Sequence, residues 1–245
     1  MNDVILLKNK FTCIKNLGWV KSLRKGPTGV GYTFEKLLGK EEDFYPIPDF
    51  GNIEIKAHRK SSNYSITLFN ATPDGENFFE IKRIYNKYGH YSSSDKKNKV
   101  LKNCAISNKL SNVGIWYKFS LFVSDFDKKV FLCGFDKNNI LIDMHSFWSY
   151  EYLEERVLGK IKYLAFISAD NKTVGGVEYY RYTDLQFYKL KSFSKFIDLV
   201  KKGKIIVTFK IDIFKNGNRT GQIHDHGTGF NINSDDLSLL YDRVF

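Results

Sequence analysis

The sequence predicts a mixed α/β fold, in which helices flank a central sheet. Three observations favour it. Apolar residues ahead of residue 40 recur at helical spacing, residues 52–58 alternate between apolar and charged side chains, and residues 163–169 form an almost continuous apolar run. The first pattern is typical of an amphipathic helix, the second of a half-buried strand and the third of a fully buried strand. Helices and strands that follow each other in this way form an α/β core.

Two helices are expected at the start of the chain. The first covers residues 1–17. In the second, Phe34, Leu37 and Leu38 have the i, i+3, i+4 spacing of an apolar stripe, and Gly39 is the expected C-cap. Glycine is favoured there because it adopts a positive φ without steric cost.

The strand expected at 52–58 has one apolar and one charged face. The apolar positions are Ile53, Ile55 and Ala57, and the charged ones are Glu54, Lys56 and His58. Successive side chains of a strand point to opposite faces, so the charged face is available for chemistry. Pro48 has no N–H to donate, which places Asp49 at a strand edge or turn beside Glu54.

Later elements follow from the same patterns. The stretch 74–111 is polar and rich in lysine, and it is either an arm that becomes ordered on a partner or a solvated loop. Strand patterns occupy 118–124, 129–136, 140–144, 163–169 and 205–214, and a helical pattern occupies 150–158. Turns are expected at 125–128, 174–176 and 216–217, the last being an Asn-Gly hairpin signal.

Composition favours a folded protein with a polyanionic partner. The chain has 245 residues, 42% of them hydrophobic and 16% aromatic, which is enough for a substantial core. Its formal net charge of +11 favours nucleic acid, because basic residues at phosphates release condensed counterions. An AT-rich genome that over-uses Lys and Asn explains the same charge and stays open as an alternative.

The cysteines and the N-terminus indicate a cytoplasmic protein. Cys13, Cys104 and Cys133 are odd in number and widely spaced, which argues against a disulfide framework or a structural zinc site. Residues 4–7 form only a short apolar run, and no segment approaches the roughly 18 apolar residues that span a bilayer. We therefore expect no export signal and no membrane partner.

The charged face of the 52–58 strand has the groups of a metal-dependent phosphodiesterase. Asp49 and Glu54 offer the carboxylate oxygens that Mg²⁺ prefers, and Lys56 can orient the attacking water or neutralise developing charge. Glu35, on the preceding helix, is a possible third acid. The alternative is an ordinary edge strand with a Glu-Lys pair on its solvent face.

Four stretches together resemble a known family. They are RKGPTGVGYTFEKLLGKEED at 24–43, PDFGNIEIKAH at 48–58, YLAFISAD at 163–170 and IHDHGTGF at 223–230. In this order and spacing they resemble the MvaI/BcnI family of type II restriction endonucleases, closest to its MvaI side, and more distantly the mismatch-repair nicking enzyme MutH. The similarity covers nearly the whole chain.

The resemblance implies a PD-(D/E)xK restriction-endonuclease-like core with a mixed central sheet flanked by helices, plus a DNA-recognition lobe. The catalytic lobe is expected at 1–170, with 74–111 as a DNA-contacting arm, and the recognition lobe at 171–245. Asp49, Glu54 and Lys56 match the family's catalytic triad, with the two acids as metal ligands. Glu35 matches the acid from the preceding helix.

The resemblance also implies what the protein acts on. The expected activity is Mg²⁺-dependent cleavage of double-stranded DNA at a short pseudo-palindrome, CCNGG-like, for example CCWGG. The expected enzyme is a monomer that nicks the two strands in sequence, with a cognate DNA methyltransferase as its genetic partner. Two alternatives remain, a MutH-like nicking endonuclease and a catalytically inert DNA-binding module.

The C-terminal stretch holds candidate DNA contacts. In an extended segment His224 and His226 share a face and can reach base edges or phosphates. Two other interpretations are open. One is a metal site formed by the two histidines and Asp225, although strand alternation places Asp225 on the other face. The other is that local hydrogen bonds satisfy both histidines.

Two residues depart from the MvaI pattern. Lys210 and Asn231 stand where that branch has arginines. An arginine fork reads guanine in a bidentate way, whereas lysine is a flexible point donor and asparagine suits adenine better, which leaves the target sequence open. The glycine-rich loop at 26–31 lacks the context of a nucleotide-binding loop, so a DNA-backbone contact is preferred. The predicted DNA-binding residues are Thr28, Lys210, Arg219, His224, His226 and Asn231.

Overall fold

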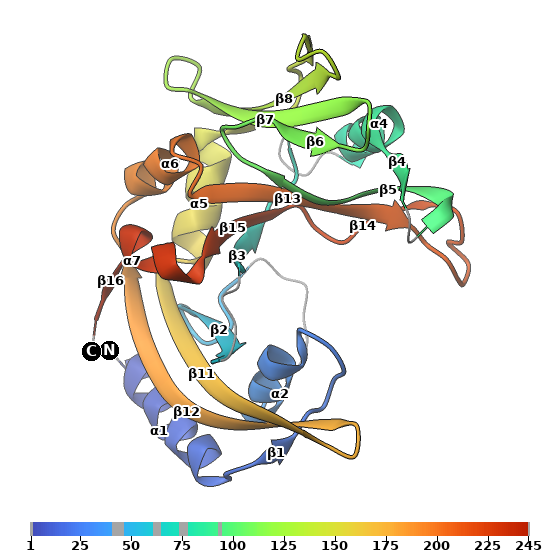
Figure 1. The fold of residues 1–245 in the computed structure, drawn as a ribbon. Helices are drawn as coiled ribbons and strands as arrows, with labels where there is room; N and C mark the ends of the chain where they lie inside the picture. Colours follow the sequence, from blue (N-terminus) through green and yellow to red (C-terminus); the bar gives the residue numbers. More distant parts are fainter. Residues whose placement is uncertain (1, 41–46, 61–64, 74–77, 93–94, 245) are drawn as a thin grey trace. The chain divides into compact units, whose positions relative to one another are not determined.

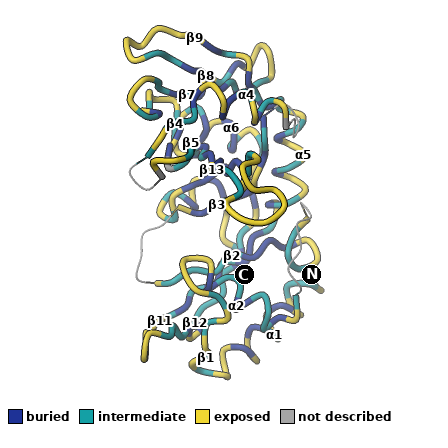
Figure 2. Tube along the Cα trace, turned by 90° about the vertical axis from the view of Figure 1, so that its right-hand side faces the viewer, coloured by how far each residue is buried: buried dark blue, intermediate teal, exposed yellow. Residues whose placement is uncertain are grey.

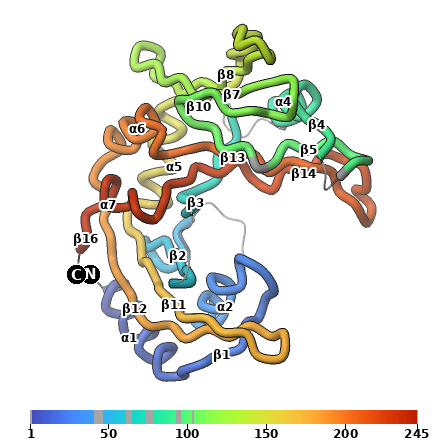
Figure 3. Tube along the Cα trace, in the orientation of Figure 1, coloured from blue at the N-terminus to red at the C-terminus, as the bar shows by residue number. Residues whose placement is uncertain are grey.

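The computed structural model describes residues 2–40, 47–60, 65–73, 78–92 and 95–244 (Figure 1). The chain forms two compact units. Unit 1 combines residues 1–64, 157–191 and 240–245, and unit 2 combines residues 65–156 and 192–239. Figure 3 follows the chain by colour through both units. No described helix is long and apolar enough to cross a membrane.

These units differ from the division at residue 170 that the sequence suggested. Strand β11 (Tyr163–Val174) and strand β12 (Val177–Leu190) form one long antiparallel hairpin, whose paired residues run from 163 to 189. Residue 170 lies inside this hairpin, so both sides of the expected boundary belong to unit 1. The chain instead passes from one unit to the other after residues 64, 156, 191 and 239.

Unit 1 is built on a mixed sheet in the order β1-β12-β11-β2, with β16 also paired to β12. The remaining strands are β1 (Val20–Lys21), β2 (Ile53–Arg59) and β16 (Tyr241–Arg243). Strand β2 runs parallel to β11, whereas the other pairs are antiparallel. The strands expected at 52–58 and 163–169 are thus confirmed. So is the turn at 174–176, where Gly175 and Gly176 have φ values of +56° and +75°.

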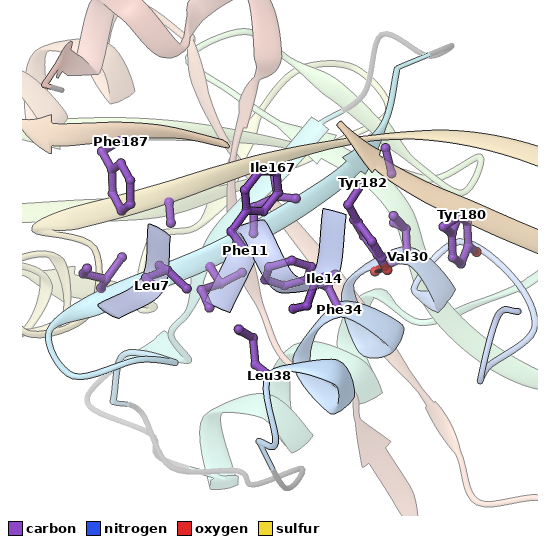
Figure 4. Close-up of a cluster of buried hydrophobic side chains, with 14 residues drawn as sticks. Leu7, Phe11, Ile14, Val30, Phe34, Leu38, Ile167, Tyr180, Tyr182 and Phe187 are labelled. Atoms are coloured by element: carbon purple, nitrogen blue, oxygen red, sulfur yellow. Dashed lines mark hydrogen bonds between the residues drawn. The ribbon is translucent and has the colours of Figure 1, made fainter. Parts of the chain in front are cut away.

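Helices α1 (Asn2–Asn16) and α2 (Gly29–Leu37) supply the apolar core of unit 1, as the sequence predicts. Figure 4 shows their side chains gathered with those of the sheet. Phe34 of α2 is fully buried, with its ring 6.3 Å from Phe11 and 5.0 Å from Tyr182. The cluster contains Leu7, Phe11, Ile14, Val30, Phe34, Leu38, Ile53, Ile55, Ala165, Ile167, Ala169, Tyr180, Tyr182 and Phe187.

Unit 2 contains two further sheets. One has the order β3-β15-β13-β5-β4 with β14 paired to β13, and the other the order β10-β8-β7-β6 with β9 paired to β8. The first is made by β3 (Ser65–Asn70), β4 (His90–Ser92), β5 (Asp95–Ile106), β13 (Ile205–Ile213), β14 (Ile223–Asp225) and β15 (Gly229–Asn233). The second is made by β6 (Ser111–Val113), β7 (Tyr117–Ser124), β8 (Lys129–Asp136), β9 (Leu141–Asp143) and β10 (Phe147–Ser149).

The expected later elements are confirmed. Strands β7, β8, β9 and β13 match the predicted ranges, and the turn at 125–128 joins β7 to β8 as a hairpin. Helix α5 (Tyr150–Lys160) matches the helix expected at 150–158. The other helical segments are α4 (Phe78–Tyr88), α6 (Phe193–Lys201), η1 (Ser234–Asp236) and α7 (Leu237–Leu240). In Figure 2, strand interiors are largely buried while the hairpin ends are exposed.

The expectation of an arm or solvated loop at 74–111 is wrong for the described part of that stretch. It folds as α4, β4, β5 and β6, apart from residues 74–77 and 93–94, which lie outside the described residues. Its lysines and asparagines conceal a helical apolar stripe. That stripe consists of the buried residues Ile81, Ile84, Tyr85 and Tyr88, at i, i+3, i+4 and i+7.

A buried carboxylate fastens α4 to the second sheet of unit 2. Asp143 of β9 has a side chain only 3% exposed, and it binds Arg83 at 2.5 Å, Lys87 at 3.0 Å and the Tyr88 hydroxyl at 2.9 Å. Burial alone would raise the pKa of Asp143, but the hydrogen bonds from Arg83 and Lys87 outweigh burial and lower the pKa well below its usual range. The ionised carboxylate therefore stabilises the folded state.

Replacing Asp143 with asparagine is expected to lower the free energy of unfolding at neutral pH by about 1.5–3 kcal/mol, the cost of losing charged hydrogen bonds. The folded pKa lies below the unfolded one, so the wild-type advantage exists above pH ~4 and fades as the pH falls further. Urea unfolding of wild type and D143N between pH 2 and 7 measures this difference in the free energy of unfolding. The control is Asp242→Asn, whose side chain is 67% exposed; equal pH dependence of D143N and wild type would contradict the prediction.

Candidate active site

A tight turn places Asp49 beside strand β2. The backbone groups of Phe50 and Ile53 bond each other in both directions at 2.9 Å, and Gly51 between them has a φ of +57°. That positive φ favours glycine, because a glycine adopts it without steric cost. A Cβ at Gly51 would also lie 2.4 Å from the Asp3 carboxylate, so a larger residue would displace that side chain. This turn returns the Asp49 carboxylate to the strand, where it accepts a hydrogen bond from the Ile55 backbone N–H at 2.9 Å.

Glu54 lies on β2 and is only 2% exposed. Its Oε1 accepts a hydrogen bond from the Lys56 ammonium at 2.7 Å, and its Oε2 lies 3.7 Å from Lys160. Oε2 is buried and has no hydrogen-bond partner among the described residues. The interpretation of an ordinary Glu-Lys pair on a solvent face is therefore wrong: β2 is an edge strand, but its acid is covered.

The C-terminus of α2 brings in a residue that the sequence reasoning missed. Gly39 has a φ of +84° and donates to the Lys36 carbonyl, and the Lys40 N–H donates to the Glu35 carbonyl. This pair of bonds is a Schellman motif, which turns the chain sharply after a helix. It delivers the Lys40 ammonium to Asp49 Oδ1 at 2.5 Å. The glycine C-cap was readable in the sequence, but the ion pair that follows it was not.

The structure brings Glu35 into the same electrostatic environment. Burial raises the pKa of Glu35, and the Asp49 carboxylate raises it further. Burial also raises the pKa of Glu54, against the opposing effect of Lys56. Asp49 differs: burial would raise its pKa, but hydrogen bonds from Lys40 and the Ile55 backbone lower it overall. The surroundings of the three neighbouring acids therefore favour the ionised form of Asp49 and the protonated forms of Glu35 and Glu54.

This arrangement fits a bound divalent cation. A buried carboxylate oxygen without a hydrogen bond is unfavourable, and Lys160 lies too far from Oε2 of Glu54 to donate one, so a hard cation would complete this oxygen. Asp49 and Glu54 offer two oxygen donors, as is usual for a cation that keeps several waters. Lys160 was also missed from the sequence: it is the last residue of α5, and the parallel pairing of β11 with β2 brings it near Glu54.

The glycine-rich loop ahead of α2 is exposed and anchored from behind. Thr28, the N-cap residue of α2, is exposed and its side chain makes no cap hydrogen bond. Arg59 holds the loop by donating to the Gly26 carbonyl at 3.0 Å, and Glu178 fixes Arg59 at 2.7 Å. A Cβ at Gly29 would lie 2.5 Å from a neighbouring carbonyl, so α2 can begin there only with glycine. The first N–H of this helix, that of Gly29, is already used, because it donates to the Gly26 carbonyl at 3.1 Å. An anion at this helix start would therefore meet the exposed Thr28 hydroxyl and not the Gly29 N–H.

Unit 2 brings the two predicted histidines together on a hairpin. Strands β13 and β14 pair with Asp212 opposite His224, and the His226 N–H donates to the Lys210 carbonyl at 2.9 Å. The 216–217 turn lies within a longer connection, residues 214–222, with Gly217 at a φ of +82°. The hairpin signal is thus confirmed, but in a wider loop.

Rings and charges on this hairpin form a stack. The Arg219 guanidinium lies 4.1 Å from the centre of the Phe214 ring, that ring lies 3.9 Å from His224, and His224 lies 3.8 Å from His226. Asp212 Oδ1 contacts His226 Nε2 at 2.9 Å, and its other oxygen pairs with Lys102 of β5. The interpretation of local hydrogen bonding therefore holds for His226, through Asp212, which the sequence reasoning did not identify.

The two positions that departed from the MvaI pattern have different surroundings. Lys210 is exposed on β13. Asn231 is only 4% exposed, and its amide is fully used by Thr67 at 2.7 Å, Thr208 at 2.9 Å and the Gly229 carbonyl at 2.8 Å. Asn231 therefore secures β15 to its neighbours from inside the sheet. This differs from the DNA contact expected of it, and no sequence pattern indicated its burial.

Alternation separates Asp225 from the two histidines, as expected. Its carboxylate accepts the Gly227 N–H at 2.8 Å and lines a cavity of about 150 Å³. The cavity is lined by Asn70, Ala71, Thr72, Ile81, Asp225, Gly227 and Thr228. Burial raises the pKa of Asp225. A metal site built from His224, His226 and Asp225 is therefore contradicted.

Comparison with known proteins agrees with this geometry. A model of the MvaI/BcnI restriction endonuclease family matches residues 8–241. A solved structure described as the restriction endonuclease MvaI–cognate DNA substrate complex has a TM-score of 0.90 and 32% sequence identity, covering 100% of this chain and 98% of that one. The restriction endonuclease MvaI in the absence of DNA gives a TM-score of 0.62 and 31% identity, covering 100% and 97%. A search of curated proteins found no match.

These comparisons confirm the expected fold class and the resemblance on which it rested. The match extends from α1 to β16, so it includes both the acids of unit 1 and the hairpin of unit 2. Restriction endonucleases generally use divalent metal ions and act on DNA, in agreement with the paired carboxylates of β2 and its turn. The chain belongs to the MvaI/BcnI restriction endonuclease family and is a type II site-specific deoxyribonuclease.

Proposed function

We propose that this enzyme hydrolyses double-stranded DNA in a Mg²⁺-dependent reaction at a short pseudo-palindromic site, CCNGG-like, for example CCWGG. The observation that carries the proposal is the buried Oε2 of Glu54, which has no hydrogen-bond partner among the described residues, in a cluster with Asp49, Lys56 and Glu35. Such an oxygen is costly to bury unless a ligand completes it. We assign catalysis to unit 1 and recognition to unit 2.

The residues of unit 1 have separate roles in this proposal. Asp49 and Glu54 hold the cation, and Lys40 and the Ile55 N–H keep Asp49 ionised and oriented. A bound cation would lower the pKa of water and neutralise charge on phosphate oxygens. Lys56, whose ammonium lies 2.7 Å from Glu54 Oε1, would orient the attacking water or neutralise developing charge. Glu35, with its raised pKa, accepts or relays a proton from that water.

DNA contacts are assigned to two places: base recognition to the β13–β14 hairpin of unit 2, and a backbone phosphate contact to the loop before α2 in unit 1. Lys210, Arg219, His224 and His226 present donors on one hairpin, which suits base edges and phosphates in a major groove. The exposed hydroxyl of Thr28 suits a backbone phosphate. A lysine at 210 gives a flexible point donor in place of an arginine fork, so the reading of its base pair is the least constrained.

Incubation of the purified full-length protein with unmethylated phage DNA and MgCl₂, followed by sequencing of the fragment ends, tests this function directly. Discrete fragments that disappear with EDTA and in Lys56→Ala, and whose ends define a CCNGG-like site, are expected. Cleavage of one strand only, or DNA that is bound but intact, would instead favour a partner-dependent nicking enzyme or an inert binding module. Random fragments would contradict sequence specificity.

We further propose that the enzyme acts as a monomer in the cytoplasm, beside a DNA methyltransferase that protects the same site. With a single catalytic cluster per chain, the two strands must be cut in sequence. Supercoiled plasmid is therefore expected to pass through an open-circular form at enzyme concentrations below that of the sites, as agarose gels of a time course will show. Direct conversion to linear DNA at every enzyme concentration would contradict it, as would a dimer by sedimentation.

A further inference from the structure

We propose that the hairpin of unit 2 carries a second metal site, formed by Asp212, His224 and His226, that binds a transition-metal ion of the Zn²⁺ type. Among the described residues, these three form a group whose ligand atoms all lie within 4.8 Å of one another. The site lies in unit 2, whereas the catalytic carboxylates lie in unit 1. The inference goes beyond the proposed function, which uses His224 and His226 as DNA contacts, because it concerns the same side chains in the DNA-free protein. It does not rest on the proposed function.

The distances are close to those that a metal ion requires. Zn²⁺ holds nitrogen and oxygen ligands at about 2.0–2.1 Å, so two ligands of a tetrahedral site lie roughly 3.3 Å apart. His226 Nε2 lies 2.9 Å from Asp212 Oδ1, and His224 Nδ1 lies 3.8 Å from the same oxygen. Small side-chain adjustments therefore bring all three atoms onto one ion.

Neighbouring groups orient the ligands. Lys102 pairs with Oδ2 of Asp212, which leaves Oδ1 facing the imidazoles. Phe214 stacks on His224 with an angle of 14° between the rings and limits the ring's rotation. Such outer contacts fix metal ligands in proteins. The positive charge of Lys102 repels a cation, but Lys102 pairs with Oδ2 of Asp212, and the metal ion would use Oδ1.

The ligand set selects the kind of ion. Imidazoles suit Zn²⁺, Ni²⁺, Co²⁺ and Cu²⁺, whereas Mg²⁺ prefers oxygen ligands and keeps its waters. The side chains of His224 and His226 are 32% and 41% exposed, so an ion can enter from solvent. Three protein ligands leave a coordination position for water.

Titration with CoCl₂ in excess MgCl₂, followed by visible d–d absorption of the full-length protein, tests the proposal. One Co²⁺ per chain is expected, displaced by Zn²⁺. The dissociation constant should rise about tenfold or more in His226→Ala and in Asp212→Asn. It should stay unchanged in His145→Ala, which removes an exposed imidazole outside the cluster, and in Glu54→Gln, which alters the catalytic cluster.

A second measurement needs no variant. The chain has five histidines, and Co²⁺ should broaden the ring NMR signals of His224 and His226 while leaving that of His145 sharp. The absence of d–d absorption would overturn the proposal. So would an unchanged affinity in H226A and D212N with circular dichroism spectra like that of wild type, or broadening confined to other histidines.

Discussion

Replacing Glu54 with glutamine is expected to lower the rate of DNA cleavage by at least about 10³-fold, since the loss of one pre-oriented charged group at a reaction centre costs about that much. The amide keeps the shape of the side chain but removes the negative charge that would hold the cation. It also leaves Lys56 and Lys160 without the carboxylate that they share. Single-turnover cleavage of a cognate duplex in MgCl₂ measures the effect.

Thermal unfolding of the same variant in EDTA separates a lost site from a lost fold. Burial raises the pKa of Glu54 above its ordinary value, so the ionised form is disfavoured in the folded protein at neutral pH. A neutral glutamine is relieved of that penalty, and the melting temperature of metal-free E54Q should match or exceed that of wild type. Active sites often retain such a stability cost.

Two results would contradict this role of Glu54. One is E54Q activity within tenfold of wild type. The other is a melting temperature so far below that of wild type that the activity loss follows from unfolding. Glu155→Gln is the matched control: it makes the same chemical change at an exposed residue of α5, away from the site. It should retain wild-type cleavage and stability.

Replacing His226 with alanine is expected to lower cleavage of the cognate site by about 10–100-fold, the range for one lost base-reading contact. Asp212 fixes the His226 ring at 2.9 Å, so the imidazole is held before DNA arrives. Binding to non-cognate duplex should change far less, because it depends mainly on phosphate contacts. Cleavage rates on cognate DNA and binding to both duplexes in CaCl₂ measure the two effects.

Asp212→Ala provides an internal check on this reasoning. Because Asp212 orients His226, D212A should also lose cognate cleavage, and the double variant should lose little more than H226A alone. His145→Ala is the control and should cut normally. If H226A weakened cognate and non-cognate binding equally, His226 would be a phosphate contact and not a reader of bases. Normal cleavage by H226A would remove it from recognition altogether.

Local sequence patterns predicted part of the site. Alternation over residues 52–58 put Glu54 and Lys56 on one face, and Gly39 marked the end of the helix that carries Glu35. These features depend on neighbours two to five residues apart, and backbone geometry fixes such relations. The same holds for the apolar interior of β13. The misjudged stretch was 74–111, where abundant lysines concealed a helical apolar stripe.

Long-range contacts were outside the reach of those patterns. Lys40 acts on Asp49 only because a Schellman motif redirects the chain, and Lys160 reaches Glu54 only because β11 lies parallel to β2. Asp212 meets the histidines through the register of β13 and β14. Asn231 is buried by strands that the sequence does not place beside it.

By itself, the sequence determined the mixed α/β class, the family and the acids and lysine on one strand face, because periodicity and motif spacing are local properties of the chain. Only the tertiary structure decided which charges compensate those acids, where the two units divide, and that Asp212 completes the histidine cluster. Strand pairing and burial set these features, and both depend on residues far apart in sequence.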